Sequence, residues 1–491
     1  MALLLGYLLA DAQDPMTFFF VAITGTVLTI PLMMQWYHPI LIFAWNMNAA
    51  PAIPGRPHLW ALVAFLAFIV VVINRAMTEQ NRFPSISRLT KPLVALLLVF
   101  VLTAFASGGV GLSMLRSGTV GGKNYVYLVC AILGFFVLGS RAIPTAKANL
   151  YLGLFFLPGI LAASATVATW ISPVADFVFL LYSPDSELAE LAANPESVSL
   201  DQVRLRGVSL AASLVFLWYL ARIGVRDIFD FARPWRVIIL LALLCAGTLG
   251  GYRSVGISML LVFAVLFYLE KLWRSKVMIV VVAGLLVATA ALAGFADKLP
   301  LSMQRTLSFL PVEIDPMARQ SAWDSSEWRL EMWREAWKQV PEYLFKGKGY
   351  TARADDMYMV NFAIMAGHTR TWEWALISGD YHNGPLSLLI PFGIYGFLAF
   401  LWLLWAGGRY LYRTYKDSPP ELSRINTFLF AYFLVRAGFF LTVYGAIAHD
   451  LCIFTGILGF SVALNVTGRT KEVSQPVQGL ESTSLQPDGL R

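Results

Sequence analysis

Apolar blocks alternate with short polar segments along most of the chain. The blocks suit a hydrocarbon core about 30 Å thick, which takes roughly 20 helical residues to cross. We count about twelve blocks, at residues 17–35, 57–74, 92–109, 125–139, 150–170, 207–222, 237–251, 255–271, 277–296, 385–406, 426–447 and 451–466. A backbone in lipid has to satisfy its own hydrogen bonds, so each block is expected to be a helix. The pattern predicts an all-α, polytopic transmembrane bundle of about twelve spans, with 38–50 as a candidate extra or re-entrant segment.

The composition agrees with a membrane protein and argues against a soluble domain. Of 491 residues, 58% are hydrophobic and 14% are charged, and the mean hydropathy is +0.65. A soluble domain of this size needs far more polar surface. Cys130, Cys245 and Cys452 lie within or beside apolar blocks, so we interpret them as small buried hydrophobic residues. Residues 1–10 lack the basic start and the cleavage site of a signal peptide.

The formal net charge of +7 fits either a nucleic-acid binder or a membrane protein with basic cytoplasmic loops. Basic residues gather in alternate loops: Arg75, Arg82, Arg88 and Lys91; Arg141 and Lys147; Arg222, Arg226, Arg233 and Arg236; Lys271, Arg274 and Lys276; Arg409, Arg413, Lys416 and Arg424. The opposite short loops are poor in bases, and the loop at 171–206 is acidic. This asymmetry favours the membrane interpretation, with no nucleic-acid partner, and places both termini in the cytoplasm.

The topology divides the chain into five parts, one of which is a large hydrophilic loop. The parts are N-terminal spans in 1–204, central spans in 205–296, an extracytoplasmic loop in 297–384, C-terminal spans in 385–466 and a polar tail in 467–491. The loop is far longer than a turn requires, and such loops usually carry function. The Ser-, Gln- and Pro-rich tail is expected to be disordered.

Within the large loop, Ser326–Val340 has the pattern of an amphipathic helix. Its apolar positions recur at helical spacing with charged residues between them: Trp333, Ala336, Trp337 and Val340. Ser326 is the expected N-cap and Pro341 the expected end of the helix. One interpretation is a helix on the membrane surface with its tryptophans at the headgroups, which is compatible with a role in catalysis.

Three residues near the outer surface are candidates for chemistry. Arg253 lies in the tight turn Gly251–Ser254 between two spans, where an arginine is costly unless it has a partner. Arg329 is predicted to begin the loop helix, where a cation opposes the helix dipole. His382 precedes Asn383 at the start of the span near Leu386. The structural alternatives are a snorkelling Arg253, a surface salt bridge at Arg329 and an interfacial anchor at His382.

Together these three side chains suit transfer from a diphosphate-linked donor. Guanidinium groups are planar, permanently charged and suited to phosphate oxygens, so Arg253 and Arg329 are able to clamp a diphosphate. An imidazole such as that of His382 is able to take a proton from an attacking hydroxyl. No Asp, Glu and His cluster has metal-ligand spacing, so neither a metal nor a cofactor is expected.

These residues resemble the O-antigen ligase and O-antigen polymerase family. The resemblance includes a histidine–asparagine motif that leads into a glycine-punctuated span: His382, Asn383, Leu386, Leu389, Gly393 and Gly396. It also includes an arginine-led helix followed by a turn: Arg329, Trp333, Ala336, Pro341 and Gly347–Gly349. The family usually has serine before the arginine of the earlier outer turn, whereas this chain has Tyr252 before Arg253. The resemblance covers roughly residues 205–465.

The resemblance implies a bacterial inner-membrane enzyme with a fold similar to GT-C-type glycosyltransferases. Such an enzyme moves a glycan from an undecaprenyl-diphosphate carrier to an acceptor, by metal-independent inversion on the periplasmic side. His382 would activate the acceptor hydroxyl, while Arg253 and Arg329 would stabilise the leaving diphosphate. Asn383 would orient His382 or cap the next helix. The resemblance implies three substrate-binding residues: Asn383, Trp333 and Gly349.

Several alternatives stay open from the sequence. Within the family, the acceptor is lipid A–core for a ligase, a growing glycan for a polymerase, or a protein in a third branch. Outside it, a polysaccharide transporter or flippase and a non-catalytic assembly subunit are the competing interpretations. The acidic residues of the loop are either solvated charges, or one of them orients His382: Asp355, Asp356, Glu373 and Asp380.

Overall fold

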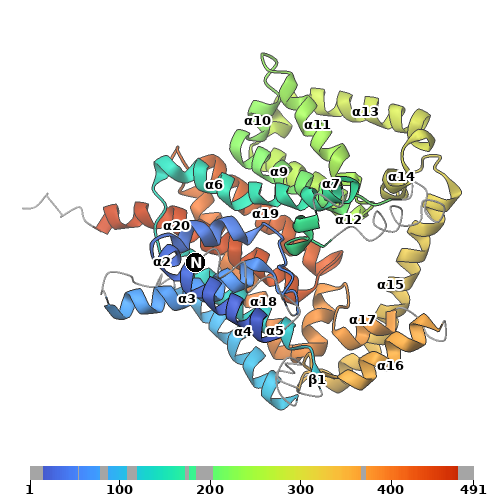
Figure 1. Cartoon of the computed structure of the whole chain (residues 1–491). Helices are drawn as coiled ribbons and strands as arrows, with labels where there is room; N and C mark the ends of the chain where they lie inside the picture. The colour runs from blue at the N-terminus through green and yellow to red at the C-terminus, as the bar shows by residue number, and fades with distance from the viewer. Residues whose placement is uncertain are drawn as a thin grey trace, which may run out of the picture.

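The computed structural model describes residues 15–53, 55–77, 87–107, 119–171, 176–183, 203–366 and 372–473. The predicted tail beyond Val473 and much of the acidic loop at 171–206 lie outside these ranges. The described part is a bundle of helices with a smaller group of helices at one end (Figure 1).

Each predicted apolar block coincides with a helix or a short series of helices. They are α2 (Pro15–Trp45), α3 (Leu59–Met77), α4 (Ser87–Ala106), α5 (Gly122–Leu138), the series α6 (Ala148–Phe156), η3 (Leu157–Ala162) and α7 (Ala163–Ile171), then α9 (Arg206–Ile223), α11 (Trp235–Thr248), α12 (Arg253–Leu269), α13 (Val277–Phe295), α18 (Gly384–Lys416), α19 (Ser423–Thr442) and α20 (Ile447–Val473). The candidate extra segment at 38–50 is largely part of α2, which has non-helical backbone angles at Trp36.

Length and composition confirm an all-α polytopic membrane protein. Within the described residues, seven helices are long and apolar enough to cross a membrane, and four shorter apolar helices accompany them. The shorter helices are α5, α11, α12 and most of α13. The total of about twelve complete crossings stays a prediction.

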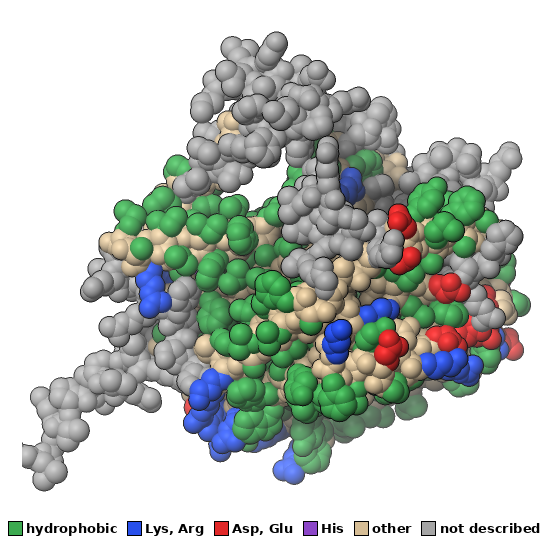
Figure 2. Space-filling view, turned by 90° about the horizontal axis from the view of Figure 1, so that it is seen from below, with side chains coloured by type: hydrophobic (Ala, Val, Ile, Leu, Met, Phe, Trp, Pro, Cys, Tyr) green, Lys and Arg blue, Asp and Glu red, His purple; other side chains and the backbone are tan. Residues whose placement is uncertain are grey.

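The polar segment between α13 and α18 folds into helices that gather at one end of the bundle (Figure 1). They are α14 (Leu301–Leu307), α15 (Pro316–Tyr343), α16 (Ala354–Met365) and α17 (Trp372–Ser378). A two-residue strand, β2 (Ala352–Arg353), pairs antiparallel with β1 (Thr119–Val120) and ties this group to the chain before α5. On the face in Figure 2, hydrophobic side chains cover the middle and most acidic ones lie toward this end. We call it the loop-bearing end of the bundle.

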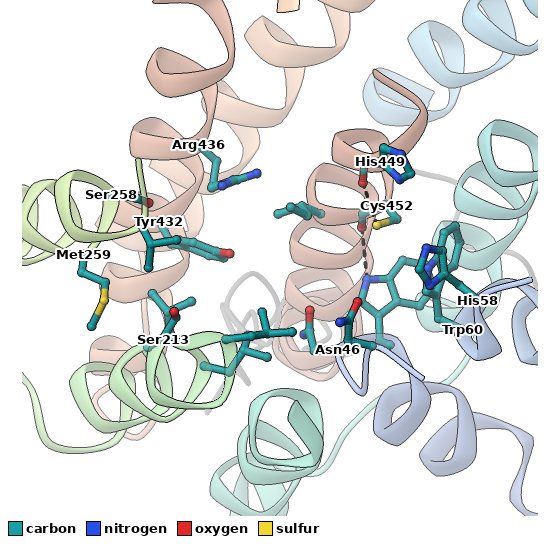
Figure 3. A pocket seen from close by; sticks show the side chains of 17 residues that line it. Asn46, His58, Trp60, Ser213, Ser258, Met259, Tyr432, Arg436, His449 and Cys452 are labelled. Carbon is teal, nitrogen blue, oxygen red and sulfur yellow. Dashed lines mark hydrogen bonds between the residues drawn. The ribbon is translucent and has the colours of Figure 1, made fainter. Parts of the chain in front are cut away.

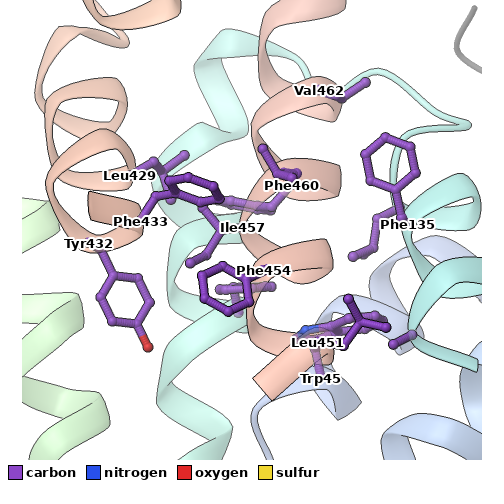
Figure 4. Packing of buried hydrophobic residues seen from close by; sticks show 14 of the residues in the cluster. Trp45, Phe135, Leu429, Tyr432, Phe433, Leu451, Phe454, Ile457, Phe460 and Val462 are labelled. Atoms are coloured by element: carbon purple, nitrogen blue, oxygen red, sulfur yellow. The ribbon is translucent and has the colours of Figure 1, made fainter. Parts of the chain in front are cut away.

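The core is centred on α20, which packs against α5, α18 and α19. Its Phe454, Ile457 and Phe460 are buried beside Phe433 of α19 (Figure 4). Two helix backbones approach closely here because Gly459 lies against Leu138 of α5. Small residues allow such contacts between membrane helices.

The cysteines only partly match the expectation that all three are buried. Cys130 is buried and Cys452 is half-buried, but Cys245 is exposed on α11, so the prediction is wrong for that residue. All three are free thiols. An apolar block does not reveal which of its faces packs inward when lipid rather than water surrounds it.

Helix α15 begins ten residues before the predicted start. Asp315 caps it by accepting a hydrogen bond from the Met317 amide (2.7 Å), and Pro316 occupies the first turn, so Ser326 is not the N-cap. The helix also continues past Pro341 to Tyr343. Arg329 therefore lies in the middle of α15, and the predicted conflict with a helix dipole is wrong.

The apolar side of α15 packs on protein rather than on a membrane surface. Ala336 and Val340 form a small core with Tyr381 and with Leu386 and Ile390 of α18. Trp337, in contrast, is exposed. This core fixes α15 against the start of α18.

A kink in α18 receives the turn that follows α15. Pro391 removes a backbone donor, and Gly393 has φ 64°, so neighbouring carbonyls lose their helical partners. The Lys348 and Gly349 amides donate to Ile390 O (2.8 Å) and Pro391 O (2.9 Å). In return the Ile394 amide donates to Leu344 O (2.6 Å). The predicted glycine turn thus completes the hydrogen bonding of a broken membrane helix.

Candidate active site at the loop-bearing end

Arg253 is the first residue of α12 and reaches across to α15. The preceding turn is tight because Gly251 adopts φ 66°, which glycine tolerates best. The guanidinium donates to the carbonyl of Ala322 (3.1 Å) and to the hydroxyl of Ser326 (2.9 Å). Arg253 therefore has partners inside the protein and does not simply extend toward lipid headgroups.

Arg329 lies one turn after Ser326 on α15 and is partly buried. Burial lowers the pKa of Arg329, and the nearby Tyr444 hydroxyl acts in the opposite direction. The guanidinium nevertheless stays charged, as arginine does in proteins. Its charge and that of Arg253 are close enough to repel each other. Within the described residues, no acidic side chain pairs with either arginine. Two neighbouring cations without an acid form a site suited to an anion.

Further arginines add to the positive charge around the Arg253 turn. Arg204 lies against Gly251, and the guanidinium of Arg206 is 6.0 Å from the centre of the Tyr252 ring. Tyr252, which stands where the family usually has serine, therefore lies close to the guanidinium of Arg206. Sequence reasoning missed these two residues, which lie just before and at the start of α9.

The backbone of His382 is held in an unusual conformation. His382 has φ 49°, in the left-handed region that residues other than glycine rarely adopt. Both neighbouring residues are fixed. The Trp333 indole donates to Tyr381 O (2.8 Å), and Asn383 caps α18 by accepting from the Leu386 amide (3.1 Å). Strained residues held by their surroundings are concentrated at functional sites.

Two aromatic rings enclose the imidazole of His382. Tyr444, in the turn between α19 and α20, stacks on it with 5.3 Å between ring centroids and 26° between planes. Trp328, which precedes Arg329 on α15, lies 5.5 Å away at 37°. The side chain of His382 is 26% exposed, so one edge remains accessible.

Asp380 faces the Nδ1 atom of His382. Its Oδ1 atom lies 3.0 Å from that nitrogen, although the angle falls short of a hydrogen bond and neither atom has another hydrogen-bond partner among the described residues. Burial raises the pKa of Asp380, but the contact with His382 outweighs this effect and the pKa lies below its usual value. The carboxylate is therefore ionised at neutral pH and favours a proton on Nδ1, which leaves Nε2 of His382 as the basic atom.

A cavity of about 310 Å³ opens beside this cluster, between α9, α12, α19, α20 and the segment from α2 to α3 (Figure 3). Arg436 of α19 lines it and forms a buried ion pair with Asp450 of α20. The cavity is lined by Trp45, Asn46, Asn48, His58, Trp60, Leu210, Ser213, Leu214, Leu217, Val255, Ser258, Met259, Tyr432, Arg436, His449, Cys452 and Ile453.

Two of the residues expected to bind substrate have their polar groups occupied inside the protein. The Trp333 indole donates a hydrogen bond to Tyr381 O, and the Gly349 amide donates one to Pro391 O at the kink of α18. Gly349 has φ 72°, and an added Cβ would lie 2.3 Å from the Ser107 hydroxyl. Both residues support the site from behind, and substrate contact by them stays a prediction.

The structure thus brings Arg253, Arg329 and His382 together through Tyr444 and α15. Of the acids considered from the sequence, Asp380 is the one that faces His382, whereas Asp355 and Asp356 are exposed. The spacing of two residues between Asp380 and His382 was the available signal. Tyr444 carried no comparable signal.

These features describe a polytopic membrane protein with two neighbouring arginines and a histidine–carboxylate pair at one end. Residues 236–401 match the family model described as O-Antigen ligase, which supports the predicted O-antigen ligase and polymerase family. The matched region contains Arg253, Arg329 and His382. It indicates a membrane glycosyltransferase of the O-antigen ligase or polymerase type. No curated protein gives a match to the chain.

Proposed function

We propose that the protein transfers a glycan from an undecaprenyl-diphosphate carrier to an acceptor hydroxyl, on the periplasmic side of the bacterial inner membrane. The acceptor is lipid A–core for a ligase or a growing glycan for a polymerase. The observation that supports this best is the convergence of an Asp380–His382 pair with two arginines that no described acidic side chain pairs with, inside the region that matches the ligase family model. A GT-C-like fold and cytoplasmic termini belong to the same proposal.

The arginines suit the leaving group of this reaction. When the bond between the anomeric carbon and the diphosphate oxygen breaks, negative charge develops on that oxygen. Arg253 is oriented by Ala322 and Ser326 before any substrate binds, so little reorganisation is needed. Arg329 adds a second, partly buried charge on the same side.

His382 suits the role of general base. The acceptor oxygen attacks the anomeric carbon, and Nε2 of His382 takes the proton from that hydroxyl. Asp380 stabilises the imidazolium that forms and holds the tautomer with Nδ1–H. Attack opposite the departing diphosphate inverts the anomeric configuration. Binding, orientation and proton transfer are all performed by side chains of this chain.

A transfer assay with purified protein tests the proposal. Protein in nanodiscs receives an undecaprenyl-diphosphate-linked glycan with either lipid A–core or a second carrier-linked repeat, in the presence of a chelator. His382→Ala is expected to lower the rate by about 10²–10⁴, and Arg329→Ala by about 10²–10³. Arg334→Ala is the matched control because Arg334 is exposed on the same helix.

The acceptor that works distinguishes ligase from polymerase. Thermal unfolding and gel filtration check that each variant is folded. Transfer that survives both substitutions in folded protein would show that the proposed site is wrong. Lack of transfer by the wild type with either acceptor would favour a transporter or an assembly subunit instead.

A further inference from the structure

The cavity in Figure 3 adjoins the proposed transfer site but holds none of its residues. Val255 lines it two residues after Arg253 on α12. On the other side, His449 interacts electrostatically with Asp380, and Arg436 interacts with Tyr444. A molecule in the cavity is therefore within reach of the reacting groups. Its volume of about 310 Å³ is at the lower end of the range of roughly 300–1,000 Å³ for small-molecule pockets.

Two polar atoms in the cavity wall are buried and lack a hydrogen-bond partner among the residues that the structure describes. They are Nε of Arg436 and Nδ1 of His58. The terminal nitrogen of Arg436 pairs with Asp450, which leaves the Nε–H group without an acceptor. Both side chains line this cavity, and in Figure 3 they lie on either side of the helix that carries His449 and Cys452. Buried polar groups normally have hydrogen-bond partners. Two such groups without partners in one cavity therefore indicate a ligand that can form hydrogen bonds.

The rest of the lining selects the kind of ligand. Ser258 offers a hydroxyl, and Trp60 and Tyr432 offer aromatic faces. Asn46 and Ser213 each donate a hydrogen bond to a backbone carbonyl, and their oxygen atoms remain as acceptors. Burial, with the charges of His449 and Lys123, lowers the pKa of His58 to about 4, so its ring is neutral at neutral pH. Asp450 balances the charge of Arg436. A neutral ligand with several hydroxyls and an apolar face matches these features better than a diphosphate.

We propose that this cavity is a saccharide subsite, which holds a neutral sugar unit of the glycan next to the transfer site. The Nε–H of Arg436 donates to a sugar oxygen, and Nδ1 of His58 bonds a hydroxyl. An aromatic ring covers the apolar face of the sugar. The inference rests on the proposed function for the identity of the glycan. The sugar belongs to either the donor or the acceptor, and the experiment distinguishes them.

Binding is measured in the His382→Ala background, where turnover is expected to be slow, and each ligand is added without the other. Lipid-linked donor and lipid A–core acceptor are titrated separately into protein in nanodiscs, and Kd is read from microscale thermophoresis. Arg436→Lys keeps a cation for Asp450 but removes the Nε–H group. This substitution is expected to raise the Kd of one of the two ligands about tenfold. Arg409→Lys, an equivalent change on an exposed arginine of α18, is the control and leaves both Kd values unchanged.

Ser258→Leu gives an independent variant because it fills the cavity without changing either residue of the ion pair. It is expected to weaken the same ligand at least as much, with unfolding temperature unchanged or higher. A loss confined to the acceptor assigns the subsite to the acceptor sugar, and a loss confined to the donor assigns it to the donor sugar. Unchanged Kd values for both ligands in both variants would overturn the proposal and leave a cavity that holds water alone. Failure of the transferase proposal is a separate result, since it appears as absent turnover in the wild type.

Discussion

Replacing Asp380 with Asn tests the role of the carboxylate in proton transfer. The amide keeps the size of the side chain but cannot stabilise a positive charge on His382. Because Asp380 lies 3.0 Å from Nδ1, the substitution removes the nearest negative charge from the ring at the moment it gains a proton. The defect is therefore expected in kcat, with little change in KM.

The size of the defect follows from the geometry. Two unit charges 4 Å apart interact by about 4 kcal/mol at an effective dielectric of 20. The Asp380 side chain is 38% exposed, so solvent screening reduces this to roughly 1.5–3 kcal/mol. That corresponds to a decrease in kcat of roughly 10- to 100-fold. Since the pKa of Asp380 lies below its usual value of 3.8, the carboxylate is ionised in any assay near neutral pH.

Steady-state transfer over a range of donor and acceptor concentrations provides kcat and KM. Asp356→Asn is the matched control, because Asp356 is exposed on α16 and faces no group of the site. A wild-type kcat in folded Asp380→Asn protein would refute the argument that the carboxylate assists the base. A large rise in KM with unchanged kcat would instead assign Asp380 to substrate binding.

Three further predictions concern stability, each read as an apparent unfolding temperature in detergent. Gly393→Ala places a Cβ atom 2.6 Å from Leu344 O at φ 64° and is expected to destabilise the folded protein by roughly 1–3 kcal/mol. The control Gly438→Ala, on α19, meets nothing within 4 Å and is expected to be neutral or stabilising. Equal effects of the two substitutions would contradict the strain argument. His382→Gly is expected to be about 1 kcal/mol more stable than His382→Ala, because only the backbone at φ 49° distinguishes these inactive variants; the reverse order would argue against strain. The folded-state pKa of His58 is about 4 against 6.5 unfolded, so the wild type loses about 3 kcal/mol as pH falls from 6.5 to 4 and no more below that. His58→Asn lacks this loss, and identical pH profiles would contradict the burial of a neutral ring.

The membrane helices were predictable because the signal is local. Each block of apolar residues specifies a helix by itself. The basic residues between the blocks predict the orientation of the loops without any knowledge of the tertiary structure. The start of α15 was missed because periodicity alone was followed there. Asp315 and Pro316 already carry the chemistry of an N-cap and a first turn, so the correct start was present in the sequence.

The candidate site was only half predictable for a physical reason. Arg329, His382 and Asp380 lie in one segment and carry chemistry that a single sequence reveals. Tyr444, in contrast, reaches the site only when α19 and α20 pack beside that segment. The adjoining cavity likewise forms only when Arg436 of α19 and His58 from the other half of the chain come together. Spacing in sequence gives no measure of these approaches.

The kink of α18 has a consequence for how firmly α15 is held. Three backbone hydrogen bonds join the end of α15 and its following turn to the kink. Arg253 joins α12 to α15 through two hydrogen bonds of one side chain. Truncation of Arg253 is therefore expected to release α15 from α12, while the backbone hydrogen bonds keep α15 attached to α18.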